Sequence, residues 1–219
     1  MKSYIQLENT HSYKLPSEFQ DDDVRYSESL VEYFLGEYTN EGDVVFDPFA
    51  GFGTTLIVAE HMGRDPYGIE YDQERVRYIK SKLNKTDNII HGDSRELSIY
   101  DFPEINFSLT SPPFMTAFGK ADPFTAYSIV GDGYQGYLKD IQSIYKQLAL
   151  KLTKDAKVVL EVANIKKEGF VTTLAWDVAK SVSEVLLFEG EIIVNWDSYG
   201  AGYDHSYCLI FSKLSKPSK

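Results

Sequence analysis

Short runs of β-branched, aromatic and aliphatic residues alternate along the chain with segments whose apolar residues repeat at helical spacing. Val76, Ile79 and Leu83, for example, fall on one face of a helix. Strands are predicted over residues 44–46, 67–70, 88–91, 105–109, 157–162, 192–196 and 207–211. Helices are predicted over residues 54–62, about 76–83, 138–152 and about 171–186.

The alternation of strand and helix predicts an α/β fold, in which an open, mostly parallel sheet of seven strands carries helices on both faces. The last two strands leave no room for a helix between them, so we expect them to form an antiparallel hairpin. In such sheets ligands bind beyond the carboxyl ends of the strands, where the strand order reverses. The residues that follow the first four strands are therefore the candidate site.

The predicted elements form one domain over residues 24–219, preceded by an acidic, polar N-terminal arm over residues 1–23. The longest irregular stretch, residues 115–137, is the candidate lid or substrate loop. Lys120 and Tyr127 in this loop suit contact with a base, although an ordinary exposed tyrosine is an equal alternative at residue 127.

At 43% apolar and 25% charged residues, the 219-residue chain has the composition of a soluble globular protein with a sizeable core. No apolar run reaches the roughly 18 residues that a membrane span needs, and residues 1–4 do not open a secretory signal. The single cysteine, Cys208, excludes a disulfide framework or a cysteine-based metal site within one chain. We therefore expect a reducing, cytoplasmic setting.

The net charge of −11 disfavours general attraction to nucleic acid, because phosphate neutralisation by basic residues supplies most of the non-specific affinity. The excess of acidic over basic residues is uneven along the chain, however. Residues 1–43 carry a net −7 and the remaining 176 residues only −4, so a basic rim on the predicted domain stays open.

A glycine-rich turn follows the first strand, in Asp-Pro-Phe-Ala-Gly-Phe-Gly-Thr-Thr at residues 47–55. Gly51 and Gly53 allow the backbone to approach a ligand closely, and Thr54 and Thr55 begin a helix whose free N–H groups can hold a carboxylate. A turn without a ligand is the alternative. The three-glycine dinucleotide fingerprint is absent, because residue 56 is leucine.

Acidic residues follow the second and third strands. Glu70 lies about 20 residues after the glycine turn, where an acid can accept both ribose hydroxyls of a nucleoside. Asp93, in Gly-Asp-Ser at residues 92–94, can accept from the exocyclic amine of adenine. The alternatives are an exposed acid at residue 70 and an Asx turn or helix N-cap at residue 93.

The turn after the fourth strand, Thr-Ser-Pro-Pro-Phe at residues 110–114, is stiff and rich in hydrogen-bond acceptors, because each proline fixes φ and lacks an N–H. The Ser111 side chain and the Pro112 carbonyl can both accept from one amine, and the Phe114 ring can stack on a planar base. A proline-rich turn without a ligand is the alternative.

Together, the motifs at residues 47–55 and 110–114 resemble the S-adenosylmethionine-dependent amino-methyltransferases of DNA, which modify cytosine N4 or adenine N6. The Ser-Pro-Pro form of the second motif resembles the cytosine-N4 branch of this family. Residues 24–32 resemble the helix that precedes the first strand in this family, and residues 196–213 resemble its closing hairpin. The resemblance covers about residues 24–213.

The resemblance implies a Rossmann-like class I methyltransferase fold, S-adenosyl-L-methionine as cofactor and no metal. The cofactor-binding residues that it implies are Arg25, Tyr26, Ser27, Asp47, Pro48, Phe49, Gly51, Gly53, Thr54, Thr55, Glu70, Asp93 and Ser94. The predicted catalytic residues are Ser111, Pro112, Pro113 and Phe114, and the predicted substrate-binding residues are Phe114, Lys120 and Tyr127.

The implied function is methyl transfer to an exocyclic amino nitrogen in DNA, with cytosine N4 favoured over adenine N6, in a restriction–modification setting. Because residues 115–137 are short for a recognition region, a homodimer or a separate specificity subunit is expected. An RNA base and a protein glutamine amide offer similar NH₂ groups and remain alternatives. A catalytically silent binding subunit of the same fold is an alternative of another class.

Overall fold

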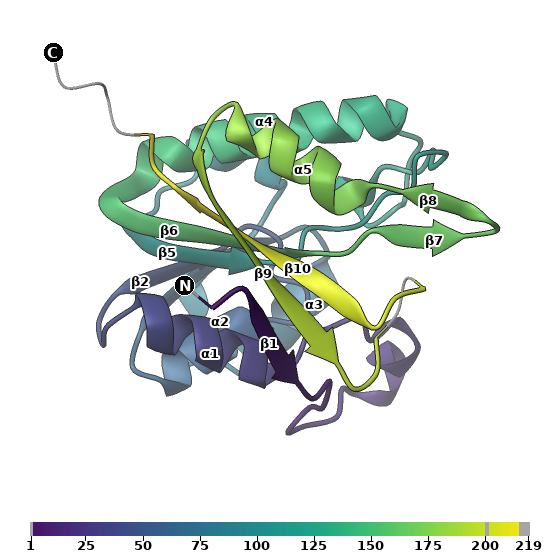
Figure 1. Ribbon diagram of the computed structural model, residues 1–219. Coiled ribbons are helices and arrows are strands. Elements are labelled where there is room, and N and C mark those ends of the chain that lie inside the picture. Colours follow the sequence, from purple (N-terminus) through teal and green to yellow (C-terminus); the bar gives the residue numbers. More distant parts are fainter. Residues whose placement is uncertain (1, 200–201, 215–219) are drawn as a thin grey trace, which may run out of the picture.

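The computed structural model in Figure 1 describes residues 2–199 and 202–214. The helices are α1 (Glu28–Tyr38), α2 (Thr54–His61), α3 (Gln73–Lys80), α4 (Gly133–Lys151) and α5 (Leu174–Ser183), with short 3₁₀ helices η1 (Ser17–Asp22), η2 (Thr86–Asn88), η3 (Ser94–Ile99) and η4 (Pro123–Thr125). The strands are β1 (Tyr4–Leu7), β2 (Val44–Asp47), β3 (Asp65–Glu70), β4 (Ile89–His91), β5 (Ile105–Thr110), β6 (Leu152–Val162), β7 (Ile165–Lys167), β8 (Phe170–Thr172), β9 (Leu187–Trp196) and β10 (His205–Ser212). Over these ranges, no helix is both long and apolar enough to cross a membrane.

The main sheet has the strand order β1-β9-β10-β6-β5-β2-β3-β4. β2 lies parallel to β3 and β5, and β5 lies parallel to β6, whereas β10 runs antiparallel to β6 and β9. The chain moves from β2 outward through β3 to β4 and then returns to start β5 on the other side of β2. The strand order therefore reverses between β2 and β5, and the predicted mostly parallel sheet with a closing antiparallel hairpin is confirmed.

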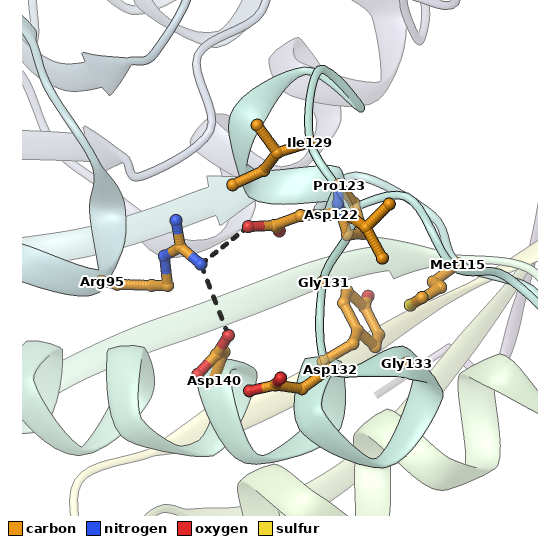
Figure 2. A pocket seen from close by; sticks show the side chains of 11 residues that line it. Arg95, Met115, Asp122, Pro123, Ile129, Gly131, Asp132, Gly133 and Asp140 are labelled. Carbon is orange, nitrogen blue, oxygen red and sulfur yellow. Dashed lines mark hydrogen bonds and ion pairs between the residues drawn. The ribbon is translucent and has the colours of Figure 1, made fainter.

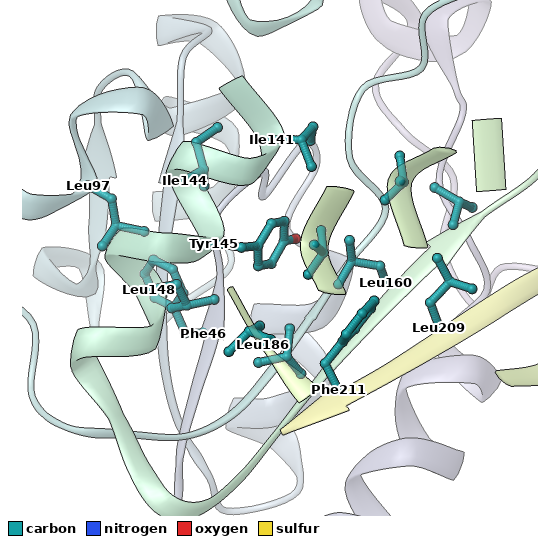
Figure 3. Close-up of a cluster of buried hydrophobic side chains, with 14 of the residues drawn as sticks. Phe46, Leu97, Ile141, Ile144, Tyr145, Leu148, Leu160, Leu186, Leu209 and Phe211 are labelled. Carbon is teal, nitrogen blue, oxygen red and sulfur yellow. The ribbon is translucent and has the colours of Figure 1, made fainter. Parts of the chain in front are cut away.

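Helices cover both faces of the sheet, with α4 and α5 on one face and α1, α2 and α3 on the other (Figure 1). Side chains of β6 alternate between the two cores: Leu160 packs with the α4 side, and Val159 packs with the α1 side. Figure 3 shows Tyr145 of α4 among Leu160 and Phe211 in the core beneath α4. Burial on both faces explains the nearly continuous apolar run of this strand.

The sheet has eight strands rather than the predicted seven. The additional strand is β1, which pairs in parallel with β9 from Tyr4↔Ile193 to Leu7↔Trp196. Part of the predicted N-terminal arm is thus built into the sheet, and Leu15 is also buried. The short, half-polar sequence of β1 carries little strand signal, since its pairing comes from an edge more than 180 residues away.

A second hairpin, β7–β8, was not predicted. It pairs Ile165 with Thr172 and Lys167 with Phe170. Its two-residue turn is Glu168-Gly169, with φ of +52° and +83°, which suits a hairpin turn that twists with its strands. The predicted helix over about 171–186 consequently begins at Leu174, after β8.

The irregular stretch predicted over 115–137 ends earlier than expected, because α4 begins at Gly133. Gly133 and Gly136 are poor helix formers and hide the helical pattern of this first turn, yet Tyr137 is buried on the core side of α4. The loop between β5 and α4 therefore covers residues 111–132.

Candidate active site

The carboxyl ends of four adjacent parallel strands lie along one edge of the sheet. Asp47 ends β2, and Glu70 at the end of β3 is in register with His91 at the end of β4. Asp93 follows β4, and Ser111 follows β5. Because the strand order reverses between β2 and β5, this edge is where an open α/β sheet holds its ligand.

Asp47 is a buried carboxylate, only 1% exposed. Its Oδ1 accepts a hydrogen bond from the Phe49 N–H at 2.9 Å, and its Oδ2 accepts from the Tyr26 hydroxyl at 3.4 Å. The same Tyr26 hydroxyl shares a short hydrogen bond with the Thr55 hydroxyl, which ties the segment before α1 to the start of α2. Burial raises the pKa of Asp47 to about 6. A cationic ligand group at this edge would favour its ionised form.

Glu70 is also buried, and its carboxylate is oriented by two backbone donors. The Gly51 N–H donates to Oε2 at 2.7 Å, and the Asp72 N–H donates to Oε1 at 2.8 Å. Burial raises the pKa of Glu70. Each carboxylate oxygen can accept another hydrogen bond besides the one from its backbone N–H. The two oxygens can therefore accept hydrogen bonds from two hydroxyl groups of a sugar.

The two glycines of the turn have different structural needs. Gly51 has φ +56°, and a Cβ there would have only the Phe49 carbonyl within 4 Å, at 3.9 Å. The crevice beside Gly51 is therefore open. Gly53 has φ +79° at the start of α2, and a Cβ there would lie 2.9 Å from the Ile79 side chain. Gly53 thus allows α2 to pack closely against α3, while Thr54 is buried behind it.

The Asp93 carboxylate pairs with Arg95, and Figure 2 shows the surroundings of Arg95. Asp93 caps η3 by accepting from the Arg95 N–H at 2.9 Å, and the Arg95 guanidinium pairs with its Oδ2 at 2.6 Å. Arg95 also pairs with Asp122 at 2.9 Å and with Asp140 at 3.7 Å, beside a cavity of about 210 Å³. The alternative predicted for Asp93, a helix N-cap, is thus present. Its contact with adenine stays a prediction.

The turns after β2 and β4 are joined by a side chain. Ser94 is buried, and its hydroxyl donates a short hydrogen bond to the carbonyl of Pro48. This bond fixes the spacing between the two turns that would enclose a ligand, so Ser94 has a structural role independent of ligand contact.

The loop that follows the Pro-Pro turn is hydrogen-bonded back to that turn. Phe114 is half-buried against the core beneath α4, and its carbonyl accepts a hydrogen bond from the Tyr127 hydroxyl at 2.7 Å. Pro112 is buried, whereas Lys120 is exposed farther along the loop. The structure therefore brings Tyr127 to the predicted catalytic turn, and Lys120 lies toward solvent.

A buried acid beside this turn was missed by sequence reasoning. Glu161 is only 2% exposed, and it follows Leu160, the register partner of Thr110 in β5. Its Oε1 accepts from the Tyr199 hydroxyl at 2.8 Å. Burial raises the pKa of Glu161, while the hydroxyls of Ser206, Tyr199 and Ser111 act to lower it.

No cation lies within ion-pair distance of Glu161 among the described residues. A buried carboxylate without such a partner is costly to a fold, so its presence at the predicted catalytic turn points to function. Its one signal in the sequence is a glutamate inside the apolar run Val-Val-Leu-Glu-Val, at residues 158–162.

The residues before α1 mostly contact one another. The Arg25 guanidinium pairs with Asp23 at 2.8 Å and lies over the Tyr13 ring, 4.8 Å from its centroid. The Ser27 hydroxyl is hydrogen-bonded to that of Ser29 at 2.8 Å. Among the residues predicted for the cofactor in this segment, Tyr26 is the one in contact with Asp47. The cofactor contacts of Arg25 and Ser27 stay predictions.

The crevice fits S-adenosylmethionine. An oriented carboxylate at Glu70 suits ribose hydroxyls, open space faces the Gly51 backbone, and the buried carboxylate of Asp47 suits a cationic group. These three features come from two adjacent strand ends, β2 and β3. They do not depend on the residues of the Pro-Pro turn.

Residues 6–81 match the family model described as DNA methylase, of the N6 and N4 type. Over this segment, the chain is similar to the DNA amino-methyltransferases. The match includes the glycine turn and Glu70, so the half of the crevice that fits the cofactor is the half that the family model covers. Asp93 and the Pro-Pro turn lie beyond the matched residues.

Curated relatives agree with this assignment. The chain is 40% identical over 63 residues to the Type II methyltransferase M.MjaII of Methanocaldococcus jannaschii, which covers 29% of this chain and 12% of the relative. It is 37% identical over 84 residues to the DNA adenine methyltransferase YhdJ of Escherichia coli, which covers 38% of this chain and 28% of the relative. The chain thus spans less than a third of the length of these relatives.

Solved structures support the fold over most of the chain. TrmN from Thermus thermophilus superimposes with a TM-score of 0.61 at 17% identity, covering 85% of this chain and 49% of that one. A TehB-like SAM-dependent methyltransferase from Corynebacterium glutamicum gives a TM-score of 0.58 at 12% identity, covering 90% and 93%. The Rossmann-like class I methyltransferase fold is confirmed by these similarities.

Proposed function

We propose that this protein is a methyltransferase that moves the methyl group of S-adenosylmethionine to an exocyclic amino nitrogen of a base in DNA. The observation that carries the proposal is the position of Ser111 and Glu161. They directly follow Thr110 of β5 and Leu160 of β6, which are register partners, on the sheet edge that also holds Asp47 and Glu70. The turn that can accept hydrogen bonds from an amine is therefore next to the crevice that suits the cofactor.

The bound cofactor supplies an electrophilic methyl group on sulfur. The lone pair of an exocyclic amine is delocalised into its ring, so the nitrogen is a poor nucleophile. Ser111 and the Pro112 carbonyl accept hydrogen bonds from the amine, which draws it toward tetrahedral geometry. These bonds strengthen as positive charge develops on nitrogen, so they stabilise the transition state more than the ground state.

A proton must leave the amine once the new N–C bond has formed and the S–C bond has broken. Glu161 is suited to receive it through the Ser111 hydroxyl, since burial makes this carboxylate a stronger base than usual and raises its pKa. The hydrogen bond from Tyr199 holds the carboxylate in place. Glu161 therefore acts as a positioning residue and proton acceptor behind Ser111.

DNA is the proposed substrate, because residues 6–81 match a family model described as DNA methylase and one curated relative is named a DNA adenine methyltransferase. The Ser-Pro-Pro wording favours cytosine N4 over adenine N6. RNA and a glutamine amide of a protein are the other acceptors with a comparable NH₂ group. The short loop over residues 111–132 and the acidic charge favour a second copy or a separate subunit for sequence recognition.

The test is transfer of a radiolabelled methyl group. The protein is incubated with labelled cofactor and, separately, with duplex DNA, single-stranded DNA, RNA and a protein extract. Label in DNA, recovered as N4-methylcytosine or N6-methyladenine after digestion, supports the proposal. Label confined to RNA or protein contradicts the substrate class, and cofactor binding without label in any pool indicates a silent subunit.

Ser111→Ala is the sharp variant, with Ser143→Ala on the exposed side of α4 as its matched control. We expect Ser111→Ala to lower the transfer rate about 10²-fold or more, as loss of a transition-state hydrogen bond does, with little change in cofactor affinity. Ser143→Ala should change neither quantity. A collapse of cofactor affinity in Ser111→Ala would contradict the role given to this turn.

A further inference from the structure

Two exposed phenylalanines lie together beside the candidate active site. Among the chain's 13 phenylalanines, Phe118 and Phe170 are the exposed ones, at 73% and 64%. Their rings meet edge to face, with centroids 5.5 Å apart and planes at 77°. Val171, beside Phe170 on β8, is 51% exposed. This much apolar surface in solvent is unfavourable unless a partner covers it.

Both rings are carried by segments that leave the active site directly. Phe118 lies four residues after Phe114 of the Pro-Pro turn, and the β7–β8 hairpin follows the end of β6 that carries Glu161. The Ala117 N–H donates to the Thr172 side chain at 2.9 Å, which ties the loop to the hairpin. In Figure 1 the hairpin projects past the end of β6. The two rings therefore flank the site where the methyl group would be transferred.

The same two segments are basic, although the chain is acidic. Lys120, Lys166 and Lys167 are all exposed, and Glu168 is the single acid among residues 115–120 and 165–172. Within the ranges that the structure describes, no carboxylate lies in ion-pair distance of these lysines. Their charge is available to a polyanion, against a chain total of −11.

We propose that Phe118, Lys120, Lys167 and Phe170 form a docking surface for unstacked nucleotides next to the target base; Lys167 is the register partner of Phe170, so the two share a face of the hairpin. This inference rests on the proposed function and names where the nucleic acid is held. Aromatic faces stack on bases of any sequence, and lysines beside them neutralise the phosphates that link those bases.

The surface also accounts for how the target base is presented. A base in a duplex must leave the stack before its amino group reaches Ser111, and the opened strand loses its stacking partners. Phe118 and Phe170 offer replacement partners on the side of the hairpin. The surface is therefore expected to favour single-stranded or opened DNA over intact duplex.

The experiment measures binding of a fluorescein-labelled single-stranded DNA oligonucleotide by anisotropy, in the presence of S-adenosylhomocysteine. The variant Phe118→Ala/Phe170→Ala is compared with Tyr4→Ala, which removes an exposed ring at the start of β1, an outer strand of the main sheet. We expect the double variant to bind about 5- to 150-fold more weakly for each stacked base that is lost. Tyr4→Ala should bind as the unaltered protein does.

The charge is tested by Lys120→Ala/Lys167→Ala against Lys139→Ala/Lys146→Ala, a pair of exposed lysines on α4. The first pair should lower the slope of log K against log salt by about 1 to 1.5, and the second should not. Unchanged oligonucleotide affinity in both the phenylalanine and the lysine variants would overturn the docking surface.

The binding assay also separates this inference from the proposed function. If the unaltered protein methylates DNA and both the phenylalanine and the lysine variants bind the oligonucleotide normally, the docking surface alone is wrong. If the unaltered protein transfers no label to DNA yet loses oligonucleotide affinity in the variants, the surface stands and the assigned reaction fails. Unchanged cofactor affinity and melting temperature verify that each variant is folded.

Discussion

Replacing Asp47 with asparagine is expected to stabilise the protein while weakening its hold on the cofactor. The carboxylate is 1% exposed, and burial raises its pKa from 3.8 to about 6. A carboxyl group whose pKa is higher in the folded state is less willing to ionise there than in the unfolded chain. The stability of the protein therefore falls as the pH rises from about 3.8 to about 6, and the full cost is present above pH 6.

The magnitude follows from the size of this shift. A shift of about 2 pKa units corresponds to about 3 kcal/mol at pH 8, and about half of that is already present at pH 5. Asparagine stays neutral at every pH and keeps an oxygen for the Phe49 N–H. The hydroxyls of Tyr26 and Thr55 can turn to accept from its amide. For a domain of this size, a gain of about 3 kcal/mol raises the melting temperature by about 6–12 °C.

The assay is thermal unfolding of Asp47→Asn and of the unaltered protein between pH 5 and pH 8, without cofactor. The control is Asp155→Asn at an exposed position of β6, whose effect should stay within about 0.5 kcal/mol. The advantage of Asp47→Asn should grow with pH, and calorimetric titration should show weaker cofactor binding. A difference that is constant across this pH range, or a variant less stable at pH 8, would refute the reasoning.

Three further changes probe the same crevice. Glu161→Gln should lower the transfer rate by about 10²–10⁴-fold. It should also abolish the fall of the rate at low pH, because that fall comes from protonation of this carboxyl, whose pKa is raised. An unaltered pH–rate profile would exclude Glu161 as the proton acceptor. Glu70→Gln should raise the dissociation constant for the cofactor about 10- to 150-fold, measured by calorimetry, through the loss of charge-assisted hydrogen bonds. Gly51→Ala, at φ +56°, should lower stability by about 1–2 kcal/mol in urea unfolding, whereas the control Gly36→Ala inside α1 should raise it by up to about 1 kcal/mol.

The positions of the residues proposed to hold the cofactor were largely predictable from the sequence. The glycine turn and Glu70 each lie directly at or after the end of one buried strand, and the carboxyl ends of adjacent parallel strands meet at one edge. Asp93 lies after β4 as predicted, but the pairing of Arg95 with both Asp93 and Asp122 was not foreseen, because Asp122 comes from the loop between β5 and α4.

The surroundings of the proposed catalytic turn were only partly predictable. Ser111 could be named because its motif is local, whereas Glu161 could not. The importance of that glutamate depends on the parallel register of β6 with β5, which brings it beside the Pro-Pro turn, and on Tyr199 reaching it from the loop after β9. Neither fact has a signature in the residues around position 161.

By itself, the sequence determined the alternation of strands and helices, the closing hairpin and the chemistry at the strand ends, because apolar periodicity, glycine and proline act through neighbouring residues. The tertiary structure alone decided which edge accepts β1, how the β7–β8 hairpin and the loop after Phe114 join into one surface, and which buried acid faces Ser111. These outcomes depend on strand pairing between residues far apart in the chain. Such pairing is selected by the packing of the whole sheet rather than by any local preference.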